Sequence, residues 1–172
     1  MFTALGRGVV AGTVGTGAMD ALLFLRYRQH GGTSDVLAWE LSRGLNNWES
    51  APVPAKVGKL LYETLLRREL PPSKAALTSN LMHWSYGLQW GALFGLSIGR
   101  GKARWWQGLL LGALVWLASY VSMPIAGFYK PIWSYDLTIL WDDLSAHLLY
   151  GFGVAAACRL TGAPPVAQAR RH

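Results

Sequence analysis

The chain has 172 residues, of which 52% are hydrophobic and only 15% are charged, whereas about a quarter of a soluble domain is usually charged. Its length fits one domain. The net charge of +7 comes from Lys and Arg that flank apolar stretches, and the charges crowd into residues 26–74, 100–104 and 159–172. This segregation favours a membrane protein and argues against nucleic-acid binding, for which the sequence has no motif.

The first apolar segment covers residues 6–25 and is rich in Gly, Ala, Thr and Val. Its length approaches the roughly 20 residues that cross a bilayer as a helix. Asp20 interrupts the segment, and Arg26 and Arg28 follow it where a signal peptide would have a cleavage site. We therefore interpret residues 6–25 as a retained transmembrane helix.

A long connection over residues 26–75 contains two patterns with helical spacing. Apolar residues recur at this spacing over residues 36–45 and again over residues 57–66, where Lys and Arg flank them. Each pattern is too short to span a bilayer. We predict two amphipathic helices on the membrane surface, separated by a turn at Pro52–Pro54. A small soluble cap packed on the membrane bundle is the alternative interpretation.

Three further apolar segments follow, over residues 76–98, 106–128 and 137–157. With the first segment they predict an all-α fold, namely an integral membrane bundle of four transmembrane helices in a single domain over residues 1–161. The tail over residues 162–172, which contains Pro164 and Pro165, is predicted to be disordered.

The short loops decide the predicted orientation, because the positive-inside rule is most reliable there. The basic turn at residues 100–104 carries three Lys or Arg, whereas the aromatic-rich turn at residues 127–136 carries only Lys130. This comparison predicts that both termini are cytoplasmic. Trp105 and Trp106 on one side, and Trp133 on the other, are predicted to anchor the helix ends at the interfaces.

Small residues recur every fourth position in three of the predicted spans. Lipid tails are as apolar as leucine, so helices in a bilayer associate by close backbone approach, which small residues permit. We therefore predict helix-packing faces, either of a tight bundle or of a homodimer, at Gly8, Gly12, Gly87, Gly91, Gly95, Gly108 and Gly112.

A short pattern recurs after 64 residues: His83-x-x-Tyr86-Gly87 in the second span matches His147-x-x-Tyr150-Gly151 in the fourth. Both spans cross the membrane in the same direction. The match suggests a two-plus-two parallel repeat about an axis normal to the bilayer. A chance match is the alternative, because five-residue matches arise readily in apolar sequence.

Polar residues within the predicted spans lie at similar depths, in the half of the bilayer nearer the long connection. Ionisable groups in hydrocarbon face the bundle interior and find partners there. The simplest interpretation is a set of hydrogen bonds between helices. Alternatives are a proton relay or cation site, a transition-metal site for zinc or iron, and two histidines that clasp a haem. The predicted cluster comprises Asp20, Asn80, His83, Tyr86, Asp143, His147 and Tyr150.

The glycine-rich stretch that leads to Asp20 within the first span, together with the two His-x-x-Tyr-Gly spans, resembles the YagU-like family of uncharacterised bacterial inner-membrane proteins. The resemblance covers most of residues 6–160 and implies a bacterial plasma-membrane location. It implies no known reaction.

The sequence contains no metalloprotease, nucleophile-elbow, P-loop or dinucleotide-binding motif. We therefore expect no catalytic residues and no cofactor. The expected function is a non-enzymatic structural or accessory role in a larger membrane complex or a homo-oligomer, with the lipid bilayer as a further partner. Proton, ion or metal handling by the Asp/His cluster is the alternative, in which a bound metal or haem is less favoured than proton or ion handling.

Overall fold

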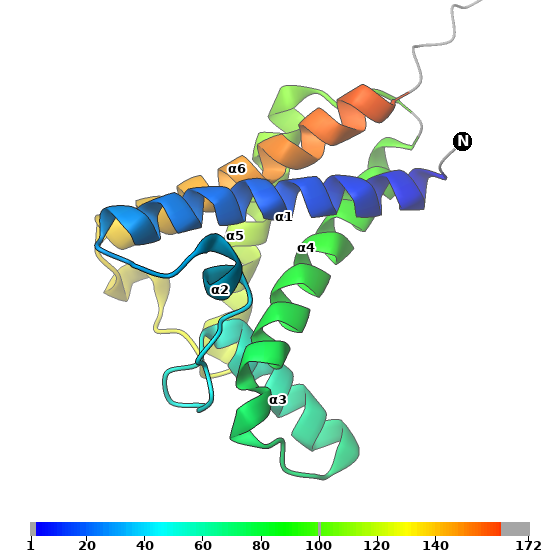
Figure 1. Cartoon of the computed structure of the whole chain (residues 1–172). Coiled ribbons are helices and arrows are strands. Elements are labelled where there is room, and N and C mark those ends of the chain that lie inside the picture. The colour runs from blue at the N-terminus through cyan, green and yellow to red at the C-terminus, as the bar shows by residue number, and fades with distance from the viewer. Residues whose placement is uncertain (1–2, 100, 163–172) are drawn as a thin grey trace, which may run out of the picture. The chain divides into compact units, whose positions relative to one another are not determined.

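The computed structural model describes residues 3–99 and 101–162, and all regular secondary structure in these ranges is helical. The predicted all-α class is therefore confirmed for this part of the chain. The predicted disordered tail lies, apart from Gly162, outside the described residues. The helices are α1 (Ala4–Gln29), α2 (Val36–Glu40), α3 (Val53–Leu66), α4 (Ala75–Ile98), α5 (Trp105–Ile125) and α6 (Leu137–Thr161) (Figure 1). Short 3-10 turns at Pro72–Lys74 and Ile132–Ser134 precede α4 and α6.

The long connection differs in detail from the prediction. The helix expected over residues 36–45 is only the five-residue α2, because the chain turns at Ser42 and Gly44, which both have positive φ. The predicted turn at Pro52–Pro54 is wrong, because α3 begins there. Pro52 caps this helix and Pro54 lies in its first turn, where a missing N–H costs nothing.

Two of the described helices, α1 and α5, are long and apolar enough to cross a membrane. Only 33% and 28% of their most apolar windows are buried, whereas the core helix of a soluble protein is mostly buried. Helices α4 and α6 have 24 and 25 residues and are therefore as long, but polar side chains interrupt both.

The chain divides into two compact units. The first unit comprises residues 1–19 and 87–172, and the second comprises residues 20–86. The boundaries fall inside α1 and inside α4, so each of these helices contributes one segment to each unit.

In the first unit, two pairs of helices meet backbone to backbone. A Cβ added to Gly12 of α1 would lie 2.7 Å from the carbonyl oxygen of Gly87 in α4, and one added to Gly8 would lie 2.5 Å from that of Gly91. Helices α5 and α6 pack together in the same way, with Gly108 against Gly151. No side chain fits at these positions, so the glycines set the distance between the helices.

The pairing follows the repeated sequence pattern. The glycine that ends His-x-x-Tyr-Gly packs on a glycine of the preceding long helix both times: Gly87 on Gly12, and Gly151 on Gly108. Gly112 continues the second contact, against the backbone of His147. In both pairs, later residues of one helix meet earlier residues of the other, so the two helices are antiparallel.

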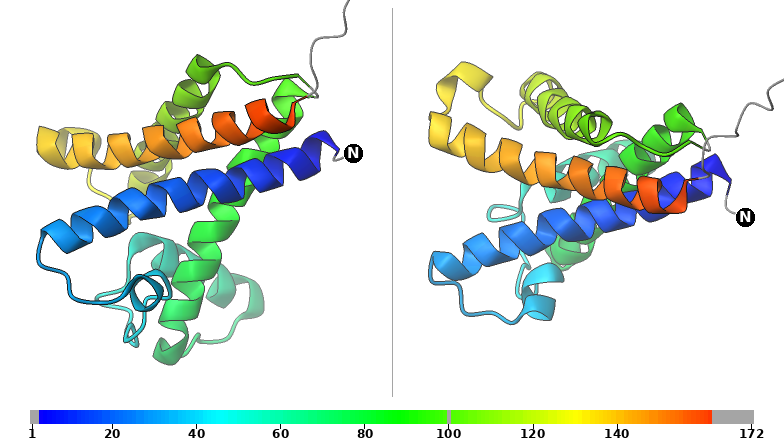
Figure 2. Two further views of the ribbon diagram at one scale, coloured as in Figure 1. Left: turned by 45° about the horizontal axis from the view of Figure 1, so that its top comes forward. Right: turned by 90° about the horizontal axis from the view of Figure 1, so that it is seen from above.

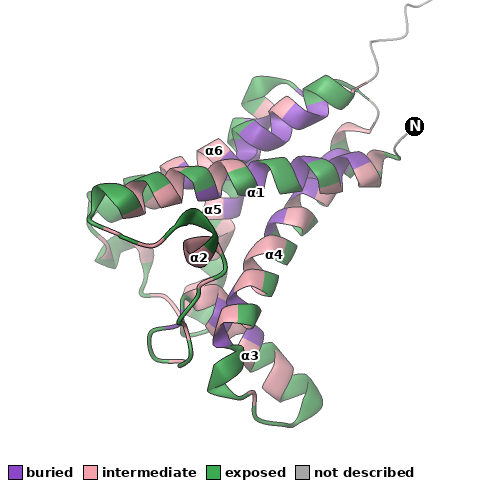
Figure 3. Cartoon of the chain, in the orientation of Figure 1, coloured by how far each residue is buried: buried purple, intermediate pink, exposed green. Residues whose placement is uncertain are grey.

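Helix α6 also runs alongside the first-unit part of α1 (Figure 2). A Cβ on Gly153 would lie 3.0 Å from the Cα of Gly15, so these backbones also approach closely. The buried residues of α6 gather in its C-terminal half, where Val154 and Cys158 are fully buried (Figure 3). The core of the first unit combines Ala, Val and Cys with larger buried side chains such as Phe94, Leu111 and Tyr150.

Arg7 of α1 connects the C-terminal ends of two other helices in the first unit. It is 5% exposed, and its guanidinium donates to the carbonyl oxygens of Gly99 (2.8 Å), Gly101 (3.0 Å) and Cys158 (2.8 Å). The last carbonyls of a helix lack partners and carry partial negative charge, so a cation is favourable there. Arg7 thus caps the C-terminal ends of both α4 and α6.

The second unit is held by aromatic and backbone contacts around α2, α3 and the first part of α4. Trp39 of α2 packs edge-on against Phe24 of α1, with ring centroids 5.4 Å apart. The phenolic oxygen of Tyr27 accepts hydrogen bonds from the backbone of Thr33 and Ser34, which fixes the turn after α1.

Replacing Arg7 with Gln should destabilise the first unit, because buried carbonyls lose charge-assisted hydrogen bonds. We expect a loss of about 2–3 kcal/mol in the free energy of unfolding, measured by denaturation in mixed micelles. Lys102→Gln is the control, since Lys102 is exposed in the neighbouring turn. Equal stability of the two variants would contradict the capping role.

Candidate functional site

A hydrogen-bonded Asp/His pair links α1 to α4 in the second unit. The Nε2 atom of His83 lies 2.8 Å from Oδ1 of Asp20. The Asp20 side chain is only 9% exposed, while that of His83 is 32% exposed. The pair is therefore closed on the carboxylate side and open to its surroundings on the imidazole side.

The second carboxylate oxygen of Asp20 has no partner. Its Oδ2 atom is buried and makes no hydrogen bond to any described residue. Buried polar atoms are nearly always satisfied, and an exception calls for an explanation such as an ion, a water molecule or a functional role. Asp20 can therefore accept one more donor or cation than the described residues supply.

A second carboxylate lies beside the same stretch of α4. The indole N–H of Trp84 donates to Oε1 of Glu40 at 2.8 Å, which holds α2 next to α4. Glu40 is close enough to His83 for its charge to act on the imidazole. His83 therefore has a second carboxylate nearby besides that of Asp20.

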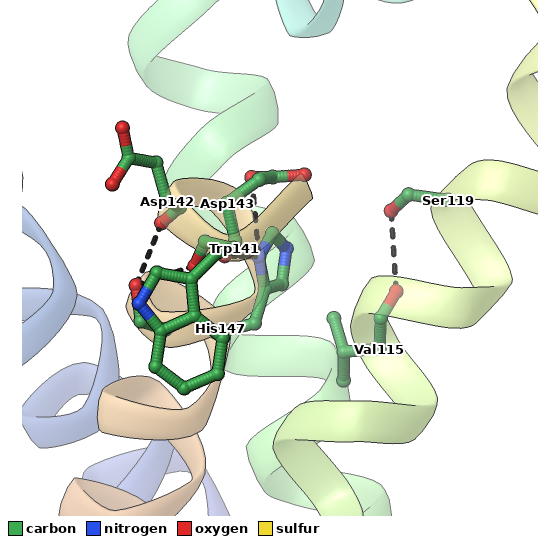
Figure 4. Close-up of polar contacts among 7 residues, drawn as sticks. Val115, Ser119, Trp141, Asp142, Asp143 and His147 are labelled. Atoms are coloured by element: carbon green, nitrogen blue, oxygen red, sulfur yellow. Dashed lines mark hydrogen bonds and ion pairs between the residues drawn. The ribbon is translucent and has the colours of Figure 1, made fainter. Parts of the chain in front are cut away.

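A separate Asp/His pair lies within α6, in the first unit. Nδ1 of His147 is 2.8 Å from the backbone oxygen of Asp143 and 3.4 Å from its Oδ1 (Figure 4). A carbonyl oxygen only accepts, so Nδ1 carries the proton. Asp142 points away from His147 in Figure 4.

Asp143 also joins an aromatic cluster of the first unit. Its side chain hydrogen-bonds Tyr120 of α5, which is 7% exposed. Tyr120 lies 5.0 Å from Trp116 and 5.4 Å from Tyr129 between ring centroids. The indole N–H of Trp116 is buried without a hydrogen-bond partner among the described residues.

Two further residues of the predicted cluster bond to backbone carbonyls. Asn80 donates to the carbonyl oxygen of Ala76 one turn earlier in α4. The Tyr150 hydroxyl is buried and donates to the carbonyl oxygen of Gly87 at 2.6 Å, which links α6 to α4 in the first unit. Tyr86 is 38% exposed. The seven predicted residues therefore comprise two Asp/His pairs, one in each unit, and three residues outside those pairs.

This geometry lends no support to a metal or haem site. Within residues 3–99 and 101–162, no group of three or more His, Cys, Asp or Glu side chains could hold a metal ion. Zinc sites use at least three protein ligands. Nε2 of His83 faces Asp20, so it is engaged rather than offered to a haem iron.

Three residues that form polar contacts between helices were not predicted from the sequence: Arg7, Glu40 and Tyr120. Each acts through a partner on a different helix, and nothing in its own neighbourhood marks it. The one available signal was Trp84 beside His83, because a buried indole N–H usually needs an acceptor.

No family model matches the chain, and comparison with curated proteins and with solved structures gives no significant match. The site is therefore interpreted from its own chemistry. It offers one buried acid–base pair with a spare carboxylate oxygen.

Proposed function

We propose that this protein is a four-span integral membrane protein with a non-enzymatic role, as a structural or accessory subunit of a membrane assembly or as a homo-oligomer. The observation that carries the proposal is the outward exposure of large apolar side chains on all four long helices. The bacterial plasma membrane implied by the YagU-like resemblance is part of this proposal.

The exposed apolar side chains run along α1, α4, α5 and α6. Soluble monomers rarely expose contiguous apolar patches larger than a few hundred Å². In a bilayer the same side chains would face lipid. The largest exposed ones include Leu25, Leu81, Leu93, Leu110, Leu117, Val121, Ile125, Ile139, Trp141 and Leu160.

The inside of the first unit has the opposite character. Its helices meet through Gly and Ala, which allow close backbone approach but bury little apolar area. This is the packing that helices use in lipid, where burial of apolar surface between helices brings no gain. Close glycine contacts between the helices and exposed large apolar side chains on their outer faces are together what a membrane bundle requires.

The contacts of Arg7 support the predicted topology. They join the start of α1 to the ends of α4 and α6 in the first unit. Arg159 lies over the Trp105 ring at the start of α5, with 5.4 Å between Cζ and the centroid. All four helices thus have one end in the same region, which also carries the basic turn at residues 100–104.

Cysteine accessibility tests this topology in a Cys158→Ala background. Thr3→Cys and Lys102→Cys should react with an impermeant maleimide from one side of sealed vesicles, and His30→Cys from the other. Leu114→Cys, at an exposed position within α5, is the control and should be protected from both sides. Labelling of Leu114→Cys by the aqueous reagent would contradict the membrane assignment.

A homo-oligomer requires a helix surface that is not already covered by other residues of the same chain. The predicted helix-packing glycines are engaged within the first unit. On α1, however, Thr13 and Gly17 are exposed, and a Cβ on Gly17 would have nothing within 4 Å. Small residues four apart on an open helix face suit a second transmembrane helix.

Replacing Gly17 with Ile should leave the fold intact and weaken self-association or subunit binding. Gly12→Ile is the matched control, because its side chain would collide with Gly87 and disrupt the α1–α4 contact. Chemical crosslinking in native membranes and light scattering in mild detergent measure the association. If Gly17→Ile assembles as the unaltered chain does, this face of α1 is not the interface.

A second candidate function is proton or cation handling at Asp20 and His83. The buried Oδ2 atom of Asp20, which has no hydrogen-bond partner among the described residues, favours this function. An ionisable group within a membrane costs free energy, so such groups commonly mark proton or ion pathways. The exposed side of His83 gives this buried carboxylate a route to an aqueous phase.

Flux measurements in proteoliposomes test this candidate. With an imposed pH gradient and an internal pH-sensitive dye, the unaltered chain should speed proton entry severalfold, and His83→Gln and Asp20→Asn should abolish the effect. Asp35→Asn is the control, because Asp35 is an exposed cap of α2. Equal flux with all variants, or none above protein-free vesicles, would leave the pair as a structural link between helices.

A further inference from the structure

Helix α3 has three distinct sides. One is buried: Ala55 and Gly58 are inaccessible, and a Cβ on Gly58 would lie 2.5 Å from the Thr78 side chain and 2.6 Å from that of Met82. The absent side chain of Gly58 lets α3 lie directly on α4 within the second unit. This contact fixes which side of α3 faces outward.

The second side is apolar and open. Leu61 and Leu65 are one helical turn apart and are 48% and 76% exposed. Leu60 is also 48% exposed, but it lies one helical turn after Lys56 and therefore beside the basic side of the helix. Exposed apolar side chains next to the buried side of a helix indicate that an apolar partner covers them.

The third side is basic. Lys56 lies nine residues before Leu65, which at about 100° per residue places the two on opposite sides of the helix. Between Val53 and Arg68 there are four basic residues, and the single acid is Glu63. Lys59 pairs with Glu63 at 2.9 Å, while Arg67 and Arg68 are exposed and have no carboxylate partner among the described residues.

Glu63 stabilises this arrangement rather than opposing it. Its carboxylate accepts from the Leu70 backbone N–H and from Lys59, both at 2.9 Å. These bonds hold the pKa of Glu63 below its ordinary range. Glu63 therefore stays ionised and paired even at an anionic surface, where the local pH is lower than in bulk.

If α4 spans the bilayer as proposed above, the point at which α3 contacts α4 gives the depth of α3 in the membrane. Thr78 and Met82 are three and seven residues after the start of α4, which corresponds to about 5–10 Å along its axis. Interfacial helices bury their apolar face about 5–10 Å into the boundary between headgroups and acyl chains. The contact with α4 holds α3 at that level.

We propose that α3 lies in the membrane interface and binds anionic phospholipid, with Leu61 and Leu65 among the acyl chains and Lys56, Arg67 and Arg68 on the headgroup phosphates. This inference rests on the proposed membrane-spanning role of α4. Each Lys or Arg near an anionic surface strengthens its attraction by a factor of about five. The partner is therefore a lipid surface of negative charge.

Fluorescence quenching of the full chain in vesicles tests the inference. An environment-sensitive dye is attached to Leu65→Cys or Lys56→Cys in a Cys158→Ala background, in phosphatidylcholine vesicles with added phosphatidylglycerol. We expect a nitroxide near the headgroups to quench the dye at position 65 and aqueous iodide to quench it at position 56. These opposite positions on α3 are matched controls for each other.

Lipid selectivity is measured with brominated lipids at equal content. Brominated phosphatidylglycerol should quench the dye at position 65 severalfold more strongly than brominated phosphatidylcholine. The variant Lys56→Gln/Lys59→Gln/Arg67→Gln/Arg68→Gln should lose this preference and keep the quenching by phosphatidylcholine. Equal quenching by both lipids in the unaltered chain would overturn the anionic-lipid assignment.

A dye at Val121→Cys separates this inference from the proposed function, because Val121 is exposed within α5. If lipid quenches position 121 but iodide quenches position 65, α3 belongs to a water-exposed cap and the inference is wrong while the spans stand. If neither quencher reaches position 65, a protein covers α3 and the inference is also wrong. If iodide quenches position 121, the membrane-spanning proposal itself fails.

Discussion

The close approach of helix backbones at glycine is the constraint on which the first unit depends. Gly12 against Gly87 and Gly108 against Gly151 leave no room for a side chain, so each contact fixes both the spacing and the register of its helices. The hydrogen bond from Tyr150 to the Gly87 carbonyl uses the same register and ties α6 to α4. A single methyl group at Gly87 would meet the hydroxyl of Thr16, which is itself buried.

This way of packing explains the distribution of residue types. Helices that touch through Gly and Ala bury little apolar area, so the hydrophobic effect that holds a soluble domain contributes little between them. Van der Waals contact and interhelical hydrogen bonds take its place, and the bonds from Arg7 to the ends of α4 and α6 are the clearest case. The large apolar side chains are then free to face outward, which is favourable in lipid and costly in water.

The sequence predicted the long helices well because length, apolarity and small-residue spacing are local properties. It failed where a single residue decides: Ser42 and Gly44 end α2 early, and Pro54 starts a helix where a turn was expected. It also placed Asn80 in the polar cluster, whereas an Asn within a helix can bond the carbonyl one turn back, as Asn80 does with Ala76. Asp20 and His83 were predicted to share a depth, and they lie in direct contact. The bond between Glu40 and Trp84 depends on how α2 folds back, which no local pattern encodes.

Helix α4 shows how one helix serves two purposes. Up to Tyr86 its side chains bind other elements of the second unit: His83 pairs with Asp20, Trp84 with Glu40, and Met82 faces α3. From Gly87 onward it carries the glycines that pack on α1 in the first unit. Polar contacts need side chains that project from the helix, whereas close backbone packing needs glycine, and in α4 the two occupy different stretches. The His-x-x-Tyr-Gly pattern marks the point where α4 changes from one to the other, and α6 begins its own tight contacts at the same pattern.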